Sequence, residues 1–136
     1  NLNMLGLREP EQYGSSTLAE INGAIRQKGE ANGVLVEAVQ SNHEGEIIDT
    51  IQKAIGACDA VIINPAGYTH SSVAIRDALQ MLTVPVIEVH LSNIYKREPF
   101  RQHSKIAGAA TGQISGLGMQ GYLLALDAVL RLIKPD

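Results

Sequence analysis

The fold of this chain is decided by the run Ala60-Val61-Ile62-Ile63, which ends at the turn signal Asn64-Pro65. Short β-branched runs with such boundaries predict buried strands. Two further runs, Val34 to Val39 and Val84 to Val89, have the same character, and a short strand is expected at Gln113 to Ser115. Because these strands alternate with longer helical stretches, the sequence predicts βαβ units and a parallel sheet.

The helical stretches are recognised by apolar residues at helical spacing, at about residues 17–29, 47–55, 71–82 and 118–133. Thr17 is followed three residues later by Glu20, a capping box that predicts the start of the first helix, and Gly29 predicts its end. Ser71 or Ser72 is expected to cap the third helix.

The predicted architecture is an α/β, flavodoxin-like, doubly wound parallel sheet between two layers of helices, a three-layer αβα sandwich. No linker or repeat interrupts the pattern, so we expect residues 1–136 to form a single domain. A sheet of this class needs a strand near its centre, ahead of the polar stretch Asn1-Leu2-Asn3. We therefore expect the native polypeptide to carry about ten residues before Asn1 that form a strand of ordinary length.

Composition excludes several classes of protein. The chain has 136 residues, 45% of them hydrophobic, and a formal net charge of -3 without blocks of Lys or Arg, which argues against nucleic-acid binding. Its apolar runs are far shorter than the roughly 20 residues of a membrane helix. No secretory signal opens the chain as written, and its one cysteine, Cys58, cannot form an internal disulfide, so we expect a cytoplasmic protein.

Polar side chains follow the predicted strands, at the edge where open α/β sheets bind ligands. Each has a simpler explanation: Asn64-Pro65 is by itself a turn, and a single histidine at a strand end is usually structural. Two histidines, His70 and His90, on adjacent strand ends shift the balance toward function. Glu88 alternates with Val89, so in a buried strand it is expected to need a partner, either His90 or a basic residue.

Known chemistries can be tested by their motifs. The chain lacks a phosphate-binding Gly-Lys-Ser/Thr turn, a Gly-x-Ser-x-Gly elbow, and any His or carboxylate cluster with metal-ligand spacing. After these exclusions, the remaining hypothesis is acid–base chemistry by tyrosine and histidine, without metal or cofactor.

Several long motifs resemble one family in collinear order across essentially the whole chain. They are residues 1–14 (NLNMLGLREPEQYG), 64–78 (NPAGYTHSSVAIRDA), 88–94 (EVHLSNI), 101–104 (RQHS) and 116–122 (GLGMQGY). Together they resemble the type II 3-dehydroquinate dehydratases, also called type II dehydroquinases.

The resemblance implies the third step of the shikimate pathway, the cofactor-free anti elimination of water from 3-dehydroquinate to 3-dehydroshikimate through an enolate. It also implies a catalytic role for five residues: the base Tyr13, its activator Arg8, the acid His90, Glu88 that orients His90, and Asn1 that holds a water against the enolate.

The same resemblance implies how substrate and subunits come together. The implied substrate-binding residues are Asn64, His70, Leu91, Ser92 and Arg101, with Leu91 and Ser92 acting through backbone amides. Asp77 matches a position that reaches a neighbouring subunit's site, and the family typically forms dodecamers built from trimers, so a homo-oligomer is expected.

Magnitudes favour Arg8 as the activator of Tyr13. A phenol ordinarily loses its proton near pH ~10, about three pH units above neutrality, which corresponds to roughly 4 kcal/mol. One guanidinium about 4 Å away contributes roughly 4 kcal/mol at an effective dielectric near 20, so a single arginine suffices.

Two alternatives stay open at this stage. One is type I dehydroquinase chemistry with a lysine Schiff base, although the chain is too short for the (β/α)₈ barrel that it needs. The other is a non-catalytic flavodoxin-like module that binds a small anion or mononucleotide without turnover.

Overall fold

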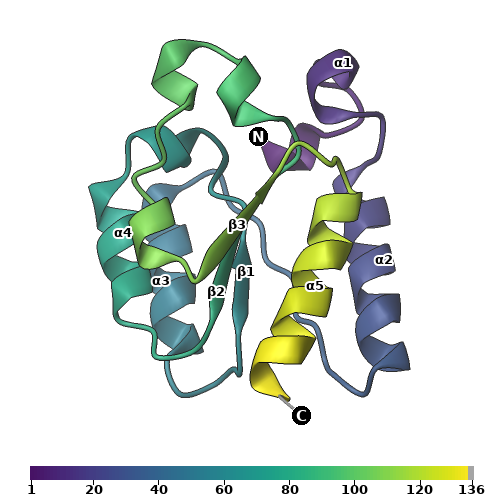
Figure 1. Cartoon of the computed structure of the whole chain (residues 1–136), viewed down its shortest axis with the longest axis vertical. Helices are drawn as coiled ribbons and strands as arrows, with labels where there is room; N and C mark the ends of the chain where they lie inside the picture. Colours follow the sequence, from purple (N-terminus) through teal and green to yellow (C-terminus); the bar gives the residue numbers. More distant parts are fainter. Residues whose placement is uncertain (135–136) are drawn as a thin grey trace.

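A computed structural model describes residues 1–134 and contains a parallel sheet with the strand order β1-β2-β3 (Figure 1). The strands are β1 (Val61–Ile63), β2 (Val86–His90) and β3 (Gly112–Ser115). Ile63 lies opposite Glu88 in one ladder, and Glu88 lies opposite Gln113 in the other. The strands predicted in these three places are confirmed, with shifts of a few residues at their ends.

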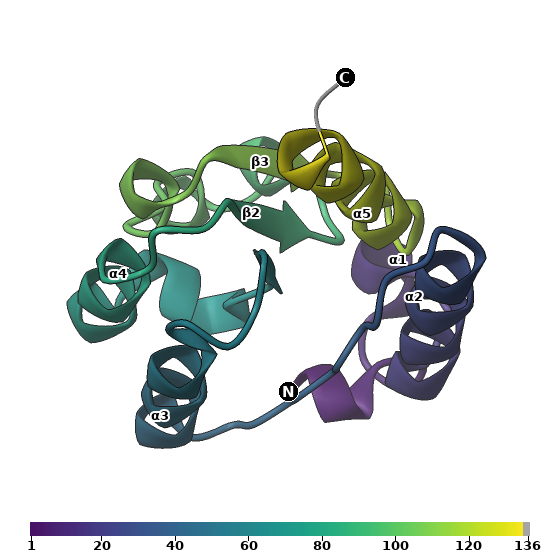
Figure 2. The ribbon, with the colours of Figure 1, turned by 90° about the horizontal axis from the view of Figure 1, so that it is seen from below.

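Helices cover both faces of this sheet (Figure 2). α3 (Glu44–Ala54) and α4 (Val73–Gln80) lie on one face, and α2 (Leu18–Ala31) and α5 (Gln120–Ile133) lie on the other. The predicted three-layer arrangement is therefore confirmed. The remaining elements are short: α1 (Pro10–Tyr13) and the 3₁₀ turns η1 (Leu2–Met4), η2 (Ala66–His70), η3 (Ile94–Lys96), η4 (Pro99–Arg101) and η5 (Ala107–Ala109).

The central strand β2 is buried along its whole length, and its side chains alternate between two apolar cores. Val86 packs with Ile51 of α3 and with Ile75 and Leu79 of α4. Ile87 and Val89 pack on the other face, against Ala125 and Val129 of α5. Because β2 faces helices on both sides, Glu88 lies in the protein interior with no exposed surface.

Local signals explain where two helices begin. The Thr17 hydroxyl accepts a hydrogen bond from the Glu20 backbone N–H at 3.1 Å, as the capping box predicts. Ser72, of the two candidates, caps α4 by accepting from the Ile75 N–H at 2.9 Å.

The predicted end of the first helix at Gly29 was wrong, because α2 continues to Ala31. Gly29 has a packing role instead. A Cβ atom at this position would lie 2.7 Å from Cγ2 of Val36 and 3.0 Å from the Val34 carbonyl oxygen, so glycine lets the following segment pack closely on α2.

The strand predicted at Val34 to Val39 was also wrong. Residues 34–40 link α2 to α3 and alternate between exposed and half-buried side chains, with Leu35 85% exposed and Val39 70% exposed. A strand is defined by its ladder as well as by its side-chain pattern. The described part of the chain places no strand beside this segment, so its backbone groups form no ladder.

No helix within residues 1–134 combines the length and the apolar character that crossing a membrane requires.

The packing of α4 on the sheet gives a test of the fold. Ile75→Ala should lower the free energy of unfolding by about 2–5 kcal/mol, because Ile75 is completely buried and its truncation leaves a cavity. Val73→Ala on the same helix is the control, since Val73 is 55% exposed and should change stability much less. Urea unfolding at one fixed protein concentration measures both, and equal losses would contradict the described packing.

Candidate active site

A cavity of about 140 Å³ opens at the carboxyl ends of the strands, beside the loop that holds η1 and α1. Most of the site residues predicted from the sequence line it. They are Asn1, Arg8, Tyr13, Asn64, His70, His90, Leu91, Ser92 and Arg101. The structure thus brings together side chains from segments that are far apart in the chain.

Glu88 and His90 form the buried part of the site. They lie two residues apart on β2, so both point to the same side of the sheet, and Nε2 of His90 shares a short hydrogen bond with Oε2 of Glu88. His90 is 5% exposed and lines the cavity, whereas Glu88 lies behind it. The predicted pairing of Glu88 with His90 is confirmed.

Several donors stabilise the Glu88 carboxylate. Burial alone would raise the pKa of Glu88, but hydrogen bonds from His90, Ser104 and Gln113 outweigh this effect and hold the pKa below its usual value. The Ser104 hydroxyl lies 3.0 Å from Oε1 and 2.9 Å from Oε2, and Nε2 of Gln113 lies 2.8 Å from Oε2. The Glu88 carboxylate therefore presents a negative charge to His90 at neutral pH.

Tyr13 lies at the end of α1, in a loop bounded by Gly6 and Gly14, whose φ angles of 92° and 79° suit glycine. Two arginines surround its ring. The guanidinium carbon of Arg8 lies 4.7 Å from the ring centroid, and that of Arg97 lies 5.1 Å from it. Nη1 of Arg97 also donates a hydrogen bond to the Tyr13 hydroxyl at 2.9 Å.

A charged run such as residues 95–98 is typical of solvated surface, but Arg97 in this run points inward. Its side chain is only 10% exposed and also donates to the Ser92 hydroxyl at 3.3 Å. The turn η3 directs Arg97 inward, while Tyr95 and Glu98 remain exposed. A run of charged residues carries no signal for this, because the direction of Arg97 depends on how the turn packs.

Asn64 is held at both ends of its amide. Its Oδ1 accepts from the Ala66 N–H at 3.0 Å, and its Nδ2 donates to the Tyr122 hydroxyl at 2.8 Å. Burial raises the pKa of Tyr122 to about 12, so this phenol stays neutral. Ala66 has a left-handed φ of 51°, an unusual backbone conformation for a residue with a Cβ, directly beside Asn64.

His70 and Arg101 are also oriented by neighbours. Nδ1 of His70 lies 2.8 Å from the His103 carbonyl oxygen. Nε of Arg101 donates to the Glu98 carboxylate at 2.7 Å. Asp77, by contrast, does not line the cavity; it lies on α4 and is exposed in the isolated chain.

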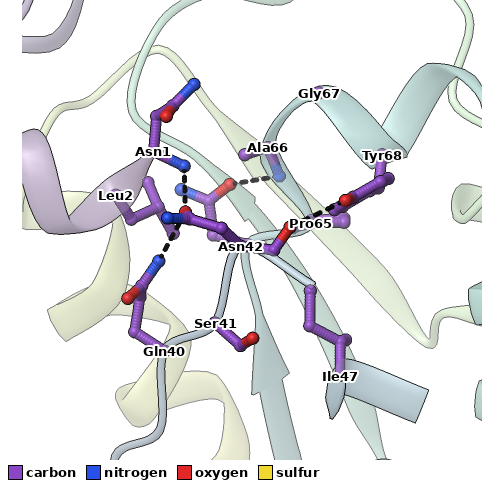
Figure 3. A pocket seen from close by; sticks show the side chains of 11 residues that line it. Asn1, Leu2, Gln40, Ser41, Asn42, Ile47, Pro65, Ala66, Gly67 and Tyr68 are labelled. Carbon is purple, nitrogen blue, oxygen red and sulfur yellow. Dashed lines mark hydrogen bonds between the residues drawn. The ribbon is translucent and has the colours of Figure 1, made fainter. Parts of the chain in front are cut away.

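A second cavity of about 220 Å³ adjoins the first and shares Asn1, Leu2, Asn64, Ala66 and Gly67 with it (Figure 3). Its wall contains Asn42, which bridges two segments. The backbone oxygen of Asn42 accepts from the Tyr68 hydroxyl at 2.8 Å, and its Oδ1 accepts from Nε2 of Gln40 at 3.1 Å. These contacts tie residues 40–42 to the turn η2 beside the site.

Within residues 1–134, no group of three or more His, Cys, Asp or Glu side chains is placed to hold a metal ion.

Known proteins are similar to this chain in sequence and in fold. The sequence model described as "Dehydroquinase class II" matches residues 1–130. The chain belongs to the class II dehydroquinase family. A 3-dehydroquinate dehydratase of Roseiflexus castenholzii is 58% identical over 130 residues, which cover 96% of this chain and 83% of that protein. One from Halothermothrix orenii is 54% identical over 134 residues, covering 98% and 90%.

Solved structures of the family agree with the fold. The crystal structure of type II dehydroquinase from Propionibacterium acnes has a TM-score of 0.93 at 42% identity and covers 96% of this chain and 90% of that one. The structure from Butyrivibrio crossotus also has a TM-score of 0.93, at 44% identity over 95% and 90% of the two chains. The predicted flavodoxin-like class is confirmed, and the type I alternative, which needs a barrel, is wrong for this dehydroquinase chain.

The site of this class II dehydroquinase contains residues that sequence reasoning missed. Arg97, Ser104 and Gln113 contact Tyr13 or Glu88 directly. Gln113 could have been found from the sequence, because a buried acid on a central strand needs donors and a polar residue on a neighbouring strand can supply one.

The lowered pKa of Glu88 predicts how stability depends on pH. Below its ordinary value of 4.5, the unfolded chain takes up a proton at Glu88 before the folded chain does, so falling pH favours unfolding. The stability advantage of the wild type over Glu88→Gln should therefore be largest above that pH and should narrow below it.

Urea unfolding between neutral pH and about pH 3.5 measures this difference. The exposed Glu30→Gln is the control, and its difference from the wild type should stay nearly constant. A constant gap for Glu88→Gln over the same range would contradict the assignment.

Proposed function

We propose that this chain is a type II 3-dehydroquinate dehydratase, a hydro-lyase that converts 3-dehydroquinate to 3-dehydroshikimate in the shikimate pathway. One observation carries the proposal: Tyr13, hydrogen-bonded to an arginine, and His90, hydrogen-bonded to a buried carboxylate, line the same cavity. An elimination next to a ketone needs such a pair, one base for the α-proton and one acid for the leaving hydroxyl.

Tyr13 acts as the base in its phenolate form. It removes the C2 proton, and the electron pair moves into the enolate of the adjacent ketone. Arg97 and Arg8 favour the negative phenolate because both place a guanidinium beside it. Of the two, Arg97 makes the direct contact, with its Nη1 2.9 Å from the phenol oxygen, so we assign it the larger share.

His90 acts as the acid. When the enolate collapses, the C1–O bond breaks and the imidazolium donates a proton, so the hydroxyl leaves as water. Glu88 keeps the imidazole protonated and oriented through Nε2. The cycle closes when Tyr13 loses its proton to solvent and His90 regains one, and no cofactor enters this balance.

The remaining side chains hold the substrate. Arg101 and the backbone amides of Leu91 and Ser92 bind its carboxylate, and Asn64 and His70 bind ring hydroxyls. Asn1 holds a water against the enolate. Apart from Asn1, these groups lie in the segments that follow β1 and β2, so the ends of two neighbouring strands set their spacing.

We further propose that the chain is cytoplasmic. We also propose that it works as a homododecamer built from trimers, in which Asp77 completes the site of a neighbouring subunit. The exposure of Asp77 on α4 leaves its carboxylate free to meet a second copy. Size-exclusion chromatography with light scattering measures the mass of the assembly. An active protein that elutes as a monomer would contradict the proposed oligomer.

The activity is tested directly by following the ultraviolet absorbance of the conjugated enone product after 3-dehydroquinate is added. Saturable binding of 3-dehydroquinate without turnover would instead support the alternative of a non-catalytic binding module. A covalent adduct trapped by borohydride would indicate Schiff-base chemistry and would overturn the mechanism.

His90→Ala should retain the fold and lower kcat by about 10²- to 10⁴-fold, the usual contribution of a positioned acid. His43→Ala is the matched control, because His43 is exposed and lies outside the cavity. Steady-state kinetics measures both variants. Turnover of His90→Ala within about twofold of wild type would show that another group protonates the leaving hydroxyl.

The two arginines can be separated by steady-state kinetics. Arg97 donates directly to the phenol oxygen, so Arg97→Met should lower kcat by about 10- to 100-fold, the size of a hydrogen bond to a charged group. Arg8→Met should give a smaller loss of kcat, since Arg8 contacts the face of the ring. Arg26→Met on the exposed face of α2 is the control. A raised KM with unchanged kcat in Arg97→Met would assign Arg97 to binding alone.

A further inference from the structure

Gln113 is a half-buried residue of β3. Neither the sequence analysis nor the proposed reaction gives it a role. It lies opposite Glu88 in the parallel ladder between β2 and β3. Its Nε2 donates to Oε2 of Glu88 at 2.8 Å, and Oε2 is the same oxygen that binds His90. Gln113 therefore touches the carboxylate at the atom on which the orientation of His90 depends.

The direction of the Gln113 amide is also fixed. Its Oε1 accepts from the Tyr95 hydroxyl at 3.1 Å and from the Ser115 hydroxyl at 3.4 Å. A carboxylate accepts hydrogen bonds and donates none, so only the NH₂ end of the amide can face Glu88. The reversed amide would place two oxygens against each other and would lose both hydroxyl contacts.

We propose that Gln113 is a positioning residue for the elimination: its amide holds Glu88 so that the carboxylate stays aligned with His90, and the Tyr95 hydroxyl fixes the direction of that amide. This inference rests on the proposed roles of Glu88 and His90. Gln113 does not line the cavity, so it acts only through Glu88.

The chemistry of the pair explains why a single amide matters. A proton shared between Glu88 and His90 can reside on either partner, and only the form with the proton on His90 can protonate the leaving hydroxyl. Each hydrogen bond donated to the Glu88 carboxylate stabilises its negative form and so favours the competent arrangement. Ser104 supplies one such donor from the loop, and Gln113 supplies another from the sheet.

The test is Gln113→Met, which keeps the length of the side chain and removes its donor. We expect kcat to fall by about 10- to 100-fold, the size of a hydrogen bond to a charged group, while KM stays within about twofold. Gln27→Met on the exposed face of α2 is the matched control and should leave both constants unchanged.

A double-mutant cycle with Glu88→Gln separates positioning from a general structural effect. Once the carboxylate is absent, Gln113→Met should lower kcat by less than about twofold further, because Gln113 has nothing left to align. Single-turnover measurements with enzyme in excess allow the rate of the slow variants to be measured. An equal loss in both backgrounds, or no loss in the wild-type background, would overturn the proposal.

Tyr95→Phe provides a second route if Gln113→Met fails to fold, since Tyr95 is 58% exposed and its loss should not disturb the core. We expect a fall in kcat of about threefold in the wild type and none with Glu88→Gln. Unchanged kcat in Tyr95→Phe would then overturn the proposal. If Glu88→Gln alone keeps the wild-type kcat, the proposed role of Glu88 is contradicted. That outcome differs from one in which Glu88→Gln lowers kcat but Gln113→Met does not, which contradicts only the role of Gln113.

Discussion

Burial of a carboxylate in the middle of the central strand constrains much of this structure. Glu88 has no exposed surface, and helices cover the sheet on both sides of it, so water cannot solvate its charge. An unpaired charge in such a place would cost several kcal/mol, which means that neighbouring segments must supply donors. They come from three places: His90 on the same strand, Gln113 on the next strand, and Ser104 in the connection between those two strands.

The position of Ser104 shows how far this constraint extends. Besides donating to Glu88, its hydroxyl accepts from the backbone N–H groups of Ile106 and Ala107, so it shapes the loop that leads to β3. Nη1 of Arg76 donates to the Lys105 carbonyl at 2.7 Å, and the Lys105 N–H donates to the Thr69 carbonyl at 2.9 Å. The environment of one acid thus connects the sheet, α4 and the turn η2.

Much of the fold follows from the sequence because its causes are local. β-Branched runs bounded by Gly, Asn or Pro predicted β1 and β2, and Thr17 and Ser72 marked helix starts through their own hydroxyls. The pairing of Glu88 with His90 followed from the two-residue period of a strand. The prediction of a strand at residues 34–39 was wrong for the converse reason. A strand also needs a neighbouring strand, and side-chain alternation carries no information about one.

The site was harder to predict where contacts join distant segments. Arg97 is separated from Tyr13 by 84 positions, and its inward direction depends on how the turn η3 packs. Nothing in the charged run at residues 95–98 distinguishes it from Lys96, which stays exposed. The family motifs identified Arg8 as the cation beside Tyr13, but the shortest contact to the phenol is made by an arginine outside those motifs.

The contact between Arg97 and Tyr13 has a consequence for how the proposed base is placed. Tyr13 belongs to a loop bounded by Gly6 and Gly14, whereas Arg97 belongs to the segment that follows β2. The proposed reaction needs the phenol oxygen beside a cation, and the two residues are 84 positions apart in the chain. The docking of this loop on the segment after β2 is therefore itself part of the proposed site, and a substitution that displaced the loop would disable the proposed base without changing either residue.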